Sequence, residues 1–289
     1  MKDILTRALT KDGSVRAFVI NSKNIVSKAF DIHKTSPVVT VALGRVLTVA
    51  SIMGAMQKEE NSALTLNFCG GGAAGNLVAV SDNQGNVRGY AVNPVVDLPL
   101  NSKGQLNVKA AVGVWGSMSI IRDLGNGKNY NGTVPIEYGE IAQDITDYYT
   151  KSEQIPTVCA LGVSVEKDWS VKSAGGFLVQ LMPNAQDETV DILEKNINKI
   201  KSVNALFEGD LTNRDILNLI FEGIDYSILS TTNPEYKCTC SQERTLRAIL
   251  SLGKEELEKM ADDEKIETTC HFCNKKYSFD PKEVLSLLK

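Results

Sequence analysis

The sequence predicts an α+β protein in three parts. These are a mixed N-terminal domain with an antiparallel sheet and a buried helix (residues 1–183), a helical linker (184–232), and a small C-terminal domain (233–289). Three observations predict this order: strand-like runs around one long apolar segment, helical spacing of apolar residues after Pro183, and four cysteines near the C-terminus. The chain of 289 residues is long enough for about two domains.

The charge balance of the chain argues against some classes of binding partner. The net charge is −4 and the pI is about 5.4, so the chain has no overall attraction to nucleic acid or anionic lipid. The N-terminal residues lack the apolar core of a signal peptide. We therefore expect a cytoplasmic protein that binds neither nucleic acid nor membrane.

The first domain begins with a predicted strand over residues 14–20. Residues 37–57 follow, with Arg45 as their only charge, and are long enough to span a bilayer. Their many small residues, and Pro37 in the first turn after a capping Thr35 or Ser36, favour a buried core helix instead.

The rest of this domain is predicted mostly as strands. Four runs predict an antiparallel meander: "ALTLNF", "NLVAVSD", "VRGYAV" and "LNVKAAVGVWG". Residues 137–151 carry apolar side chains at helical spacing. The runs "TVCALGVSV" and "GGFLVQLMP" predict two more strands.

The glycine run Gly70–Gly75 matches the dinucleotide pattern G-x-G-x-x-G, but that pattern requires a helix directly after it. An alternating segment follows instead, so we expect a loop between strands and no bound nucleotide. The chain has two histidines and no catalytic motif that we find, so we expect no enzyme activity.

The linker is predicted as two amphipathic helices. Leu193, Ile197, Ile200 and Phe207 share one face of the first, and Thr212 can cap the second, over residues 211–222. Each apolar face needs a surface to lie on. The sequence leaves open whether the linker is a fixed connector or a docked arm that can be released.

The last region contains a helix capped by Ser241 and closed by Gly253, a further turn over residues 254–260, a hairpin over 266–279, and a helix start at Asp280-Pro281. It has few large apolar side chains. A unit this small usually needs a metal or disulfides to hold its fold.

Two of the six cysteines, Cys69 and Cys159, lie in apolar strand-like runs and are predicted to be inert buried thiols. The other four are Cys238, Cys240, Cys270 and Cys273. In a chain without a secretory signal, such a cluster indicates a metal or redox site rather than a disulfide framework.

These four cysteines are predicted to bind one Zn²⁺ per chain. Cys270-x-x-Cys273 has the spacing of a zinc knuckle, and in a strand Cys238 and Cys240 would leave the same face. His271 is interpreted as a solvent-facing spacer and His33 as chemically silent.

The same thiols predict a switch. Four thiolates on Zn²⁺ keep a net negative charge and react with peroxide where they are exposed. Neighbouring thiols would then form disulfides, Cys238 with Cys240 and Cys270 with Cys273. The metal would be lost together with folding free energy of about 10 kcal/mol. An undocked linker would expose apolar surface.

The segment "CTCSQERTLRAILSLGKEELEKM…IETTCHFCNKKYSFD" resembles the C-terminal zinc region of the heat shock protein 33 family, the redox-regulated chaperones of bacteria. The upstream segments "ALGRVLTVASIMGAM", "DNQGNVRGYAVNP" and "AGGFLVQLMP" are similar to the family's core, so the resemblance covers nearly the whole chain. Thr239 departs from the family, since many relatives have an acidic residue there.

The resemblance implies a holdase that needs no ATP and protects unfolding or oxidatively damaged proteins from aggregation. Reduced members hold one zinc on the four cysteines and are inactive or weakly active. Oxidation under unfolding conditions forms the two vicinal disulfides, releases zinc, exposes the client-binding surface and favours a homodimer.

Three alternatives remain at this stage. A zinc ribbon that binds nucleic acid is disfavoured because residues 234–289 carry 10 basic and 11 acidic residues. A thiol–disulfide oxidoreductase would need a helix after Cys270-x-x-Cys273, where a strand is predicted. The third is a purely structural zinc site in a protein with another binding role.

Overall fold

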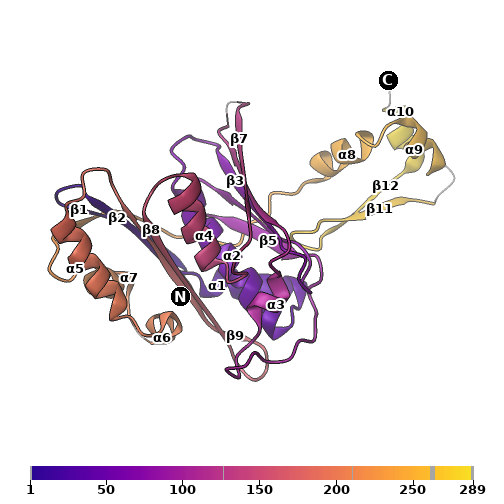
Figure 1. Ribbon diagram of the computed structural model, residues 1–289. Helices are drawn as coiled ribbons and strands as arrows, with labels where there is room; N and C mark the ends of the chain where they lie inside the picture. Colours follow the sequence, from indigo (N-terminus) through magenta and orange to yellow (C-terminus); the bar gives the residue numbers. More distant parts are fainter. Residues whose placement is uncertain (1, 126, 210, 261–263, 288–289) are drawn as a thin grey trace. The chain divides into compact units, whose positions relative to one another are not determined.

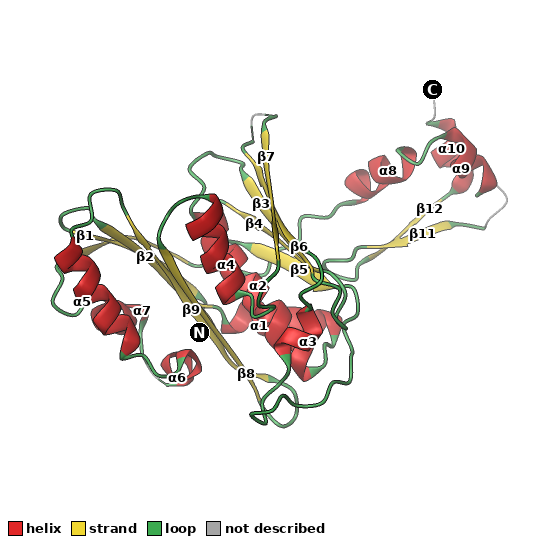
Figure 2. Ribbon diagram, in the orientation of Figure 1, coloured by secondary structure: helices red, strands yellow, loops and turns green. Residues whose placement is uncertain are grey.

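The computed structural model describes residues 2–125, 127–209, 211–260 and 264–287 (Figures 1 and 2). The chain forms two compact units, Met1–Tyr236 and Lys237–Lys289. The predicted linker lies within the first unit, so it belongs structurally to the N-terminal part of the chain.

The first unit contains two antiparallel sheets of five strands each. The first sheet has the order β10-β1-β2-β9-β8 and the second has the order β5-β4-β3-β6-β7. Strands of the first sheet are β1 (Ile4–Thr10), β2 (Val15–Asn21), β8 (Thr157–Val165), β9 (Val171–Leu181) and β10 (Tyr226–Thr232). Strands of the second are β3 (Ala63–Cys69), β4 (Leu77–Asp82), β5 (Val87–Ala91), β6 (Ser117–Asp123) and β7 (Asn129–Pro135).

Helix α2 (Pro37–Ala55) lies between the two sheets and contacts strands of both, beside α1 (Lys23–His33) (Figure 2). Its most apolar window is long enough to span a membrane but is 89% buried inside the protein. Because α2 touches neighbours on all sides, it is apolar all round. The prediction of a buried core helix is confirmed.

The apolar run of β2 follows from burial on both faces. Phe18 and Ile20 face the core around α2, whereas Ala17 and Val19 face the second layer of helices. Side chains alternate between the faces of a strand, so a strand covered on both sides becomes a continuous apolar run.

The predicted linker provides that second layer. Its helices α5 (Asp187–Asn198), α6 (Val203–Glu208) and α7 (Asn213–Ile220) cover the outer face of the first sheet. Thr212 caps α7 as predicted, accepting a hydrogen bond from the Asp215 backbone N–H. The helices are therefore docked on the sheet, and whether they can be released stays a prediction.

Three predictions about the secondary structure of the first unit are wrong. Residues 184–208 form two helices, α5 and α6, instead of one. Residues 226–232 are not helical linker but form β10, which pairs with β1 at the sheet edge. The run "LNVKAAVGVWG" is not a strand but contains α3 (Val108–Val112), capped by Asn107 and ended by Gly113 at φ 81°. Five residues are too few to distinguish a helical period from a strand.

The helix predicted within residues 137–151 is confirmed as α4 (Ala142–Asp147), which continues into one π-helical turn, η1 (Tyr148–Ser152). Elements β1, α1, β6 and β7 were not predicted from the sequence.

In the part that the structure describes, the second unit has a hairpin and three short helices. Its elements are α8 (Gln242–Leu250), α9 (Lys254–Lys259), β11 (Ile266–Thr269), β12 (Lys276–Phe279) and α10 (Pro281–Ser286). Ser241 and Asp280 cap α8 and α10 as predicted. Among the described residues of this unit, the buried apolar ones are Ile249, Leu257, Ile266, Tyr277, Phe279 and Val284. So small a core needs support from another source.

Candidate metal centre

The second cysteine pair lies at the turn of the β11–β12 hairpin. The Cys270 backbone N–H donates to the Lys275 carbonyl (2.9 Å), and the Asn274 N–H donates to the Cys270 carbonyl (2.8 Å). Asn274 adopts φ 57°, which asparagine tolerates better than most residues. This closed turn holds Cys270 and Cys273 as the knuckle spacing predicted.

The first pair lies in a loop and not in the strand that we expected. Helix α8 fixes this loop, since the Arg244 guanidinium donates to the carbonyl (3.1 Å) and the hydroxyl (2.9 Å) of Thr239. Ser241 also accepts a hydrogen bond from the Arg244 backbone N–H at 3.2 Å. Cys238 and Cys240 converge because a clamped loop, rather than a pleat, turns them inward.

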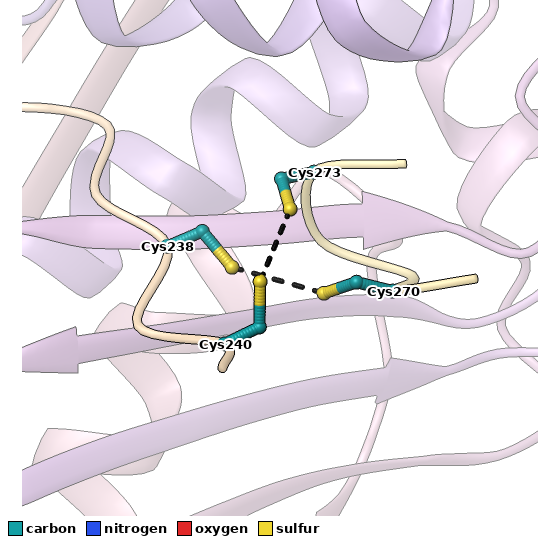
Figure 3. Close-up of side chains that lie close together, drawn as sticks. All are labelled: Cys238, Cys240, Cys270 and Cys273. Atoms are coloured by element: carbon teal, nitrogen blue, oxygen red, sulfur yellow. Dashed lines mark hydrogen bonds between the residues drawn. The ribbon is translucent and has the colours of Figure 1, made fainter. Parts of the chain in front are cut away.

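The four sulfur atoms all lie within 4.8 Å of one another (Figure 3). Cys238 and Cys270 Sγ are 3.7 Å apart, and Cys240 and Cys273 Sγ are 3.4 Å apart. A tetrahedral site with Zn–S bonds of about 2.3 Å places its sulfurs about 3.8 Å apart. The four thiols therefore suit one metal ion of the kind that prefers sulfur.

The thiols differ in acidity. Burial alone would raise the pKa of Cys240, but hydrogen bonds from Tyr277 and from the neighbouring thiols lower it to about 7. Burial raises the pKa of Cys238 to about 12. The Tyr277 hydroxyl donates to Cys240 Sγ at 3.0 Å, and this bond contributes most to raising the pKa of Tyr277 to about 12. In this arrangement Cys240 is thus more acidic than Cys238 and than Cys273, whose pKa burial raises.

The two remaining cysteines lie outside the centre. Cys159 is buried, and burial raises its pKa, as expected for an inert thiol. The prediction that Cys69 is buried is wrong, because Phe68 takes the inward position at the end of β3 and Cys69 faces out.

The glycine run forms a loop between β3 and β4, as predicted, and its backbone bonds to α3. His271 is exposed beside the knuckle. His33 Nε2 lies 3.0 Å from the Gly89 carbonyl oxygen and 3.3 Å from the Tyr236 hydroxyl. Sequence reasoning missed Arg244 and Tyr277, although each follows a cysteine pair by four residues.

A model of the family described as "Hsp33 protein" matches residues 3–280. The chain belongs to the Hsp33 family. It is 44% identical over 290 residues to the 33 kDa chaperonin of Clostridioides difficile, covering 100% of this chain and 99% of that protein. It is 43% identical over 291 residues to the 33 kDa chaperonin of Clostridium perfringens strain SM101, covering 100% of this chain and 92% of that protein.

The crystal structure of the 33 kDa chaperonin of Thermotoga maritima has the same fold. It superimposes with a TM-score of 0.90 at 37% identity, covering 99% of this chain and 97% of that one. Membership in the Hsp33 family makes chaperone action the function class of this chain, and it does not favour a zinc ribbon that binds nucleic acid.

Proposed function

We propose that this protein is a redox-regulated, ATP-independent holdase chaperone. In the reduced form Cys238, Cys240, Cys270 and Cys273 hold one Zn²⁺ and the protein is inactive. The observation that carries the proposal is the convergence of these four sulfurs within 4.8 Å of one another, from two segments some thirty residues apart.

The resting state depends on the metal because the second unit has so small a core. The four cysteines would hold the loop before α8 and the β11–β12 turn together through a bound Zn²⁺, beside a core in which six described apolar residues are buried. In such modules the free energy of metal binding is folding free energy, about 10 kcal/mol or more. Loss of the four thiolates would therefore unfold this unit.

Peroxide is the proposed oxidant. A thiolate sulfur attacks one peroxide oxygen, the O–O bond breaks, and the products are a sulfenic acid and hydroxide. A second thiolate attacks that sulfur, forming the S–S bond and expelling another hydroxide, and two protons from solvent complete two waters. Two sulfurs have lost two electrons and peroxide has gained them. With all six sulfur pairs within reach, the pairing Cys238–Cys240 and Cys270–Cys273 rests on the resemblance to the family.

The surface that the switch would uncover lies under the linker helices. The outer face of the first sheet presents Ala17, Val19, Phe177 and Val179 to α5, α6 and α7. A connected apolar surface of this kind binds unfolded chains without regard to sequence. Clients would be unfolded or partly folded proteins, the active form would be a homodimer, and no nucleotide would be needed.

The proposed compartment is the cytoplasm, where thiols are kept reduced until an oxidant appears. No catalytic turnover is assigned to the chain, since one oxidation event changes its state and clients are only held.

The test is light scattering by a heat-denatured client protein. The full chain is added either reduced and zinc-loaded, or after peroxide at elevated temperature, while a chromophoric chelator reports zinc release in the same cuvette. We expect suppression of scattering by the oxidised, zinc-free form alone, in the absence of ATP.

Two results would contradict the proposal in different ways. Zinc release without protection would mean that the centre responds to peroxide but does not control a chaperone. Zinc that stays bound after peroxide would mean that the centre is structural, and the function would then reside in the first unit.

A further inference from the structure

Tyr277 connects the two cysteine pairs of the candidate metal centre. It lies on β12, directly after the second pair, and pairs across the hairpin with Thr268. Its hydroxyl reaches back to Cys240 of the first pair, with 3.0 Å between Oη and Sγ. The side chain is 7% exposed and belongs to the small core of this unit, so its position is fixed by packing.

A phenol hydroxyl donates one hydrogen bond, and a thiolate accepts it more strongly than a thiol does. Groups that donate to metal ligands orient the ligand and hold it in its charged form. A hydrogen bond to the sulfur also draws on the lone pair with which the sulfur would attack an oxidant, so it makes the sulfur less nucleophilic. The Tyr277–Cys240 contact has the geometry for both effects.

We propose that Tyr277 is a positioning residue for this centre, whose hydroxyl holds the Cys240 sulfur as a metal ligand and slows its reaction with peroxide. The inference rests on the proposed function, because it requires Zn²⁺ on the four sulfurs. It adds a residue that sets how much oxidant the switch tolerates before it opens.

The test compares full-length wild type with Tyr277→Phe, which keeps the ring and removes the hydroxyl. Zinc affinity is measured by competition with a chromophoric chelator, and the rate of zinc release is measured over a series of peroxide concentrations. Loss of a group that supports a metal ligand typically weakens metal binding about 10- to 100-fold. We expect affinity to fall within that range and release by peroxide to become several-fold faster.

The absorption spectrum of the Co²⁺-substituted protein gives a measurement that a change in packing alone would not alter. Co²⁺ bound to thiolates absorbs by charge transfer from sulfur, so removing a hydrogen bond to one sulfur should shift this band. The matched controls are Ser278→Ala, which removes a hydroxyl from the neighbouring exposed position of β12, and Tyr226→Phe, which makes the same change in the first unit. Both should match wild type.

A second variant covers the case in which Tyr277→Phe disturbs folding. A 3-fluorotyrosine placed at position 277 has a more acidic hydroxyl and donates more strongly, so we expect slower release of zinc by peroxide than in wild type. Equal affinity, release rate and cobalt spectrum in all variants would overturn the inference while leaving the proposed function standing. Absence of zinc binding in the wild type would overturn both.

Discussion

Replacing Phe207 by alanine should loosen the linker helices while the metal centre stays intact. Phe207 on α6 is 7% exposed and lies on the first sheet at Gly175. A Cβ added to Gly175 would lie 2.3 Å from the Phe207 ring, so the ring occupies space that only glycine leaves free. Gly162, the partner of Gly175 on β8, makes the same room for Asn204.

The magnitude follows from this burial. Truncating a buried phenylalanine to alanine costs about 3–5 kcal/mol, and we take the lower end because α6 lies at the surface of the unit. Each 1.4 kcal/mol is a factor of ten, so the docking equilibrium should shift by about 100-fold toward release. We expect backbone amides of α6 to exchange with deuterium about 100-fold faster in the reduced, zinc-loaded protein.

The assay is hydrogen exchange read by mass spectrometry on peptides that cover residues 203–208, together with client scattering in the reduced state. Leu219→Ala is the control, because Leu219 on α7 is 44% exposed and its truncation should change little. If Phe207→Ala exchanged like wild type at α6, the docked layer would not depend on this contact. If exchange rose but the reduced protein still protected no client, the covered face would not be the client surface.

Three further outcomes are expected. Cys270→Ser should abolish stoichiometric zinc binding and the ordered fold of residues 237–289, measured by metal analysis and circular dichroism; full zinc content would contradict the four-sulfur site. Removal of Zn²⁺ from the reduced protein by a chelator should leave all four cysteines of residues 237–289 open to alkylation at similar rates, because the metal-free unit is unfolded and its thiols take the unfolded pKa of about 8.5. A thiol that stayed protected after zinc removal, measured by mass spectrometry, would contradict folding that depends on the metal. Asn213→Ala removes the hydrogen bonds that its side-chain amide makes to three oxygens of β1 and β2, and should destabilise docking of α7 by about 1–3 kcal/mol. Backbone amides of α7 should then exchange with deuterium faster than in wild type, whereas the control Asn198→Ala should leave their exchange unchanged.

The small C-terminal unit could be predicted closely because its signals are local. Ser241 and Asp280 each cap the next helix through their own side chains, and a knuckle turn is encoded in the four residues from Cys270 to Cys273. The prediction that the first pair lies in a strand was wrong because Arg244, rather than a neighbouring strand, holds its loop. The contact between Arg244 and Thr239 depends on the direction of the arginine side chain, which the spacing of residues in the sequence does not reveal.

The sheets were harder to predict because their partners are distant in the sequence. Strand β10 pairs with β1 across more than two hundred residues, and residues 226–232 alone show only a short run of β-prone side chains after two helices. The glycines at 162 and 175 were visible in the sequence, but their role depends on Phe207 and Asn204 of another element. Such contacts depend on tertiary packing, which local patterns do not specify.

The way the chain leaves the first unit bears on how a signal from the cysteines would spread. Three hydrogen bonds hold the chain to the first unit between β10 and Cys238. The Asn233 side-chain amide donates to the Asp3 carbonyl (2.9 Å), and the Tyr236 hydroxyl donates to the Gly89 carbonyl (2.8 Å). The Glu235 carbonyl accepts from the Val87 N–H (3.0 Å). Unfolding of residues 237–289 therefore ends at a hydrogen-bonded segment two residues before the first ligand. Helices α5 to α7 lie between β9 and β10, so they are tethered to the sheet at both ends. Loss of order in residues 237–289 alone would therefore leave α5 to α7 on the sheet, so the proposed switch would also need conditions that loosen the first unit.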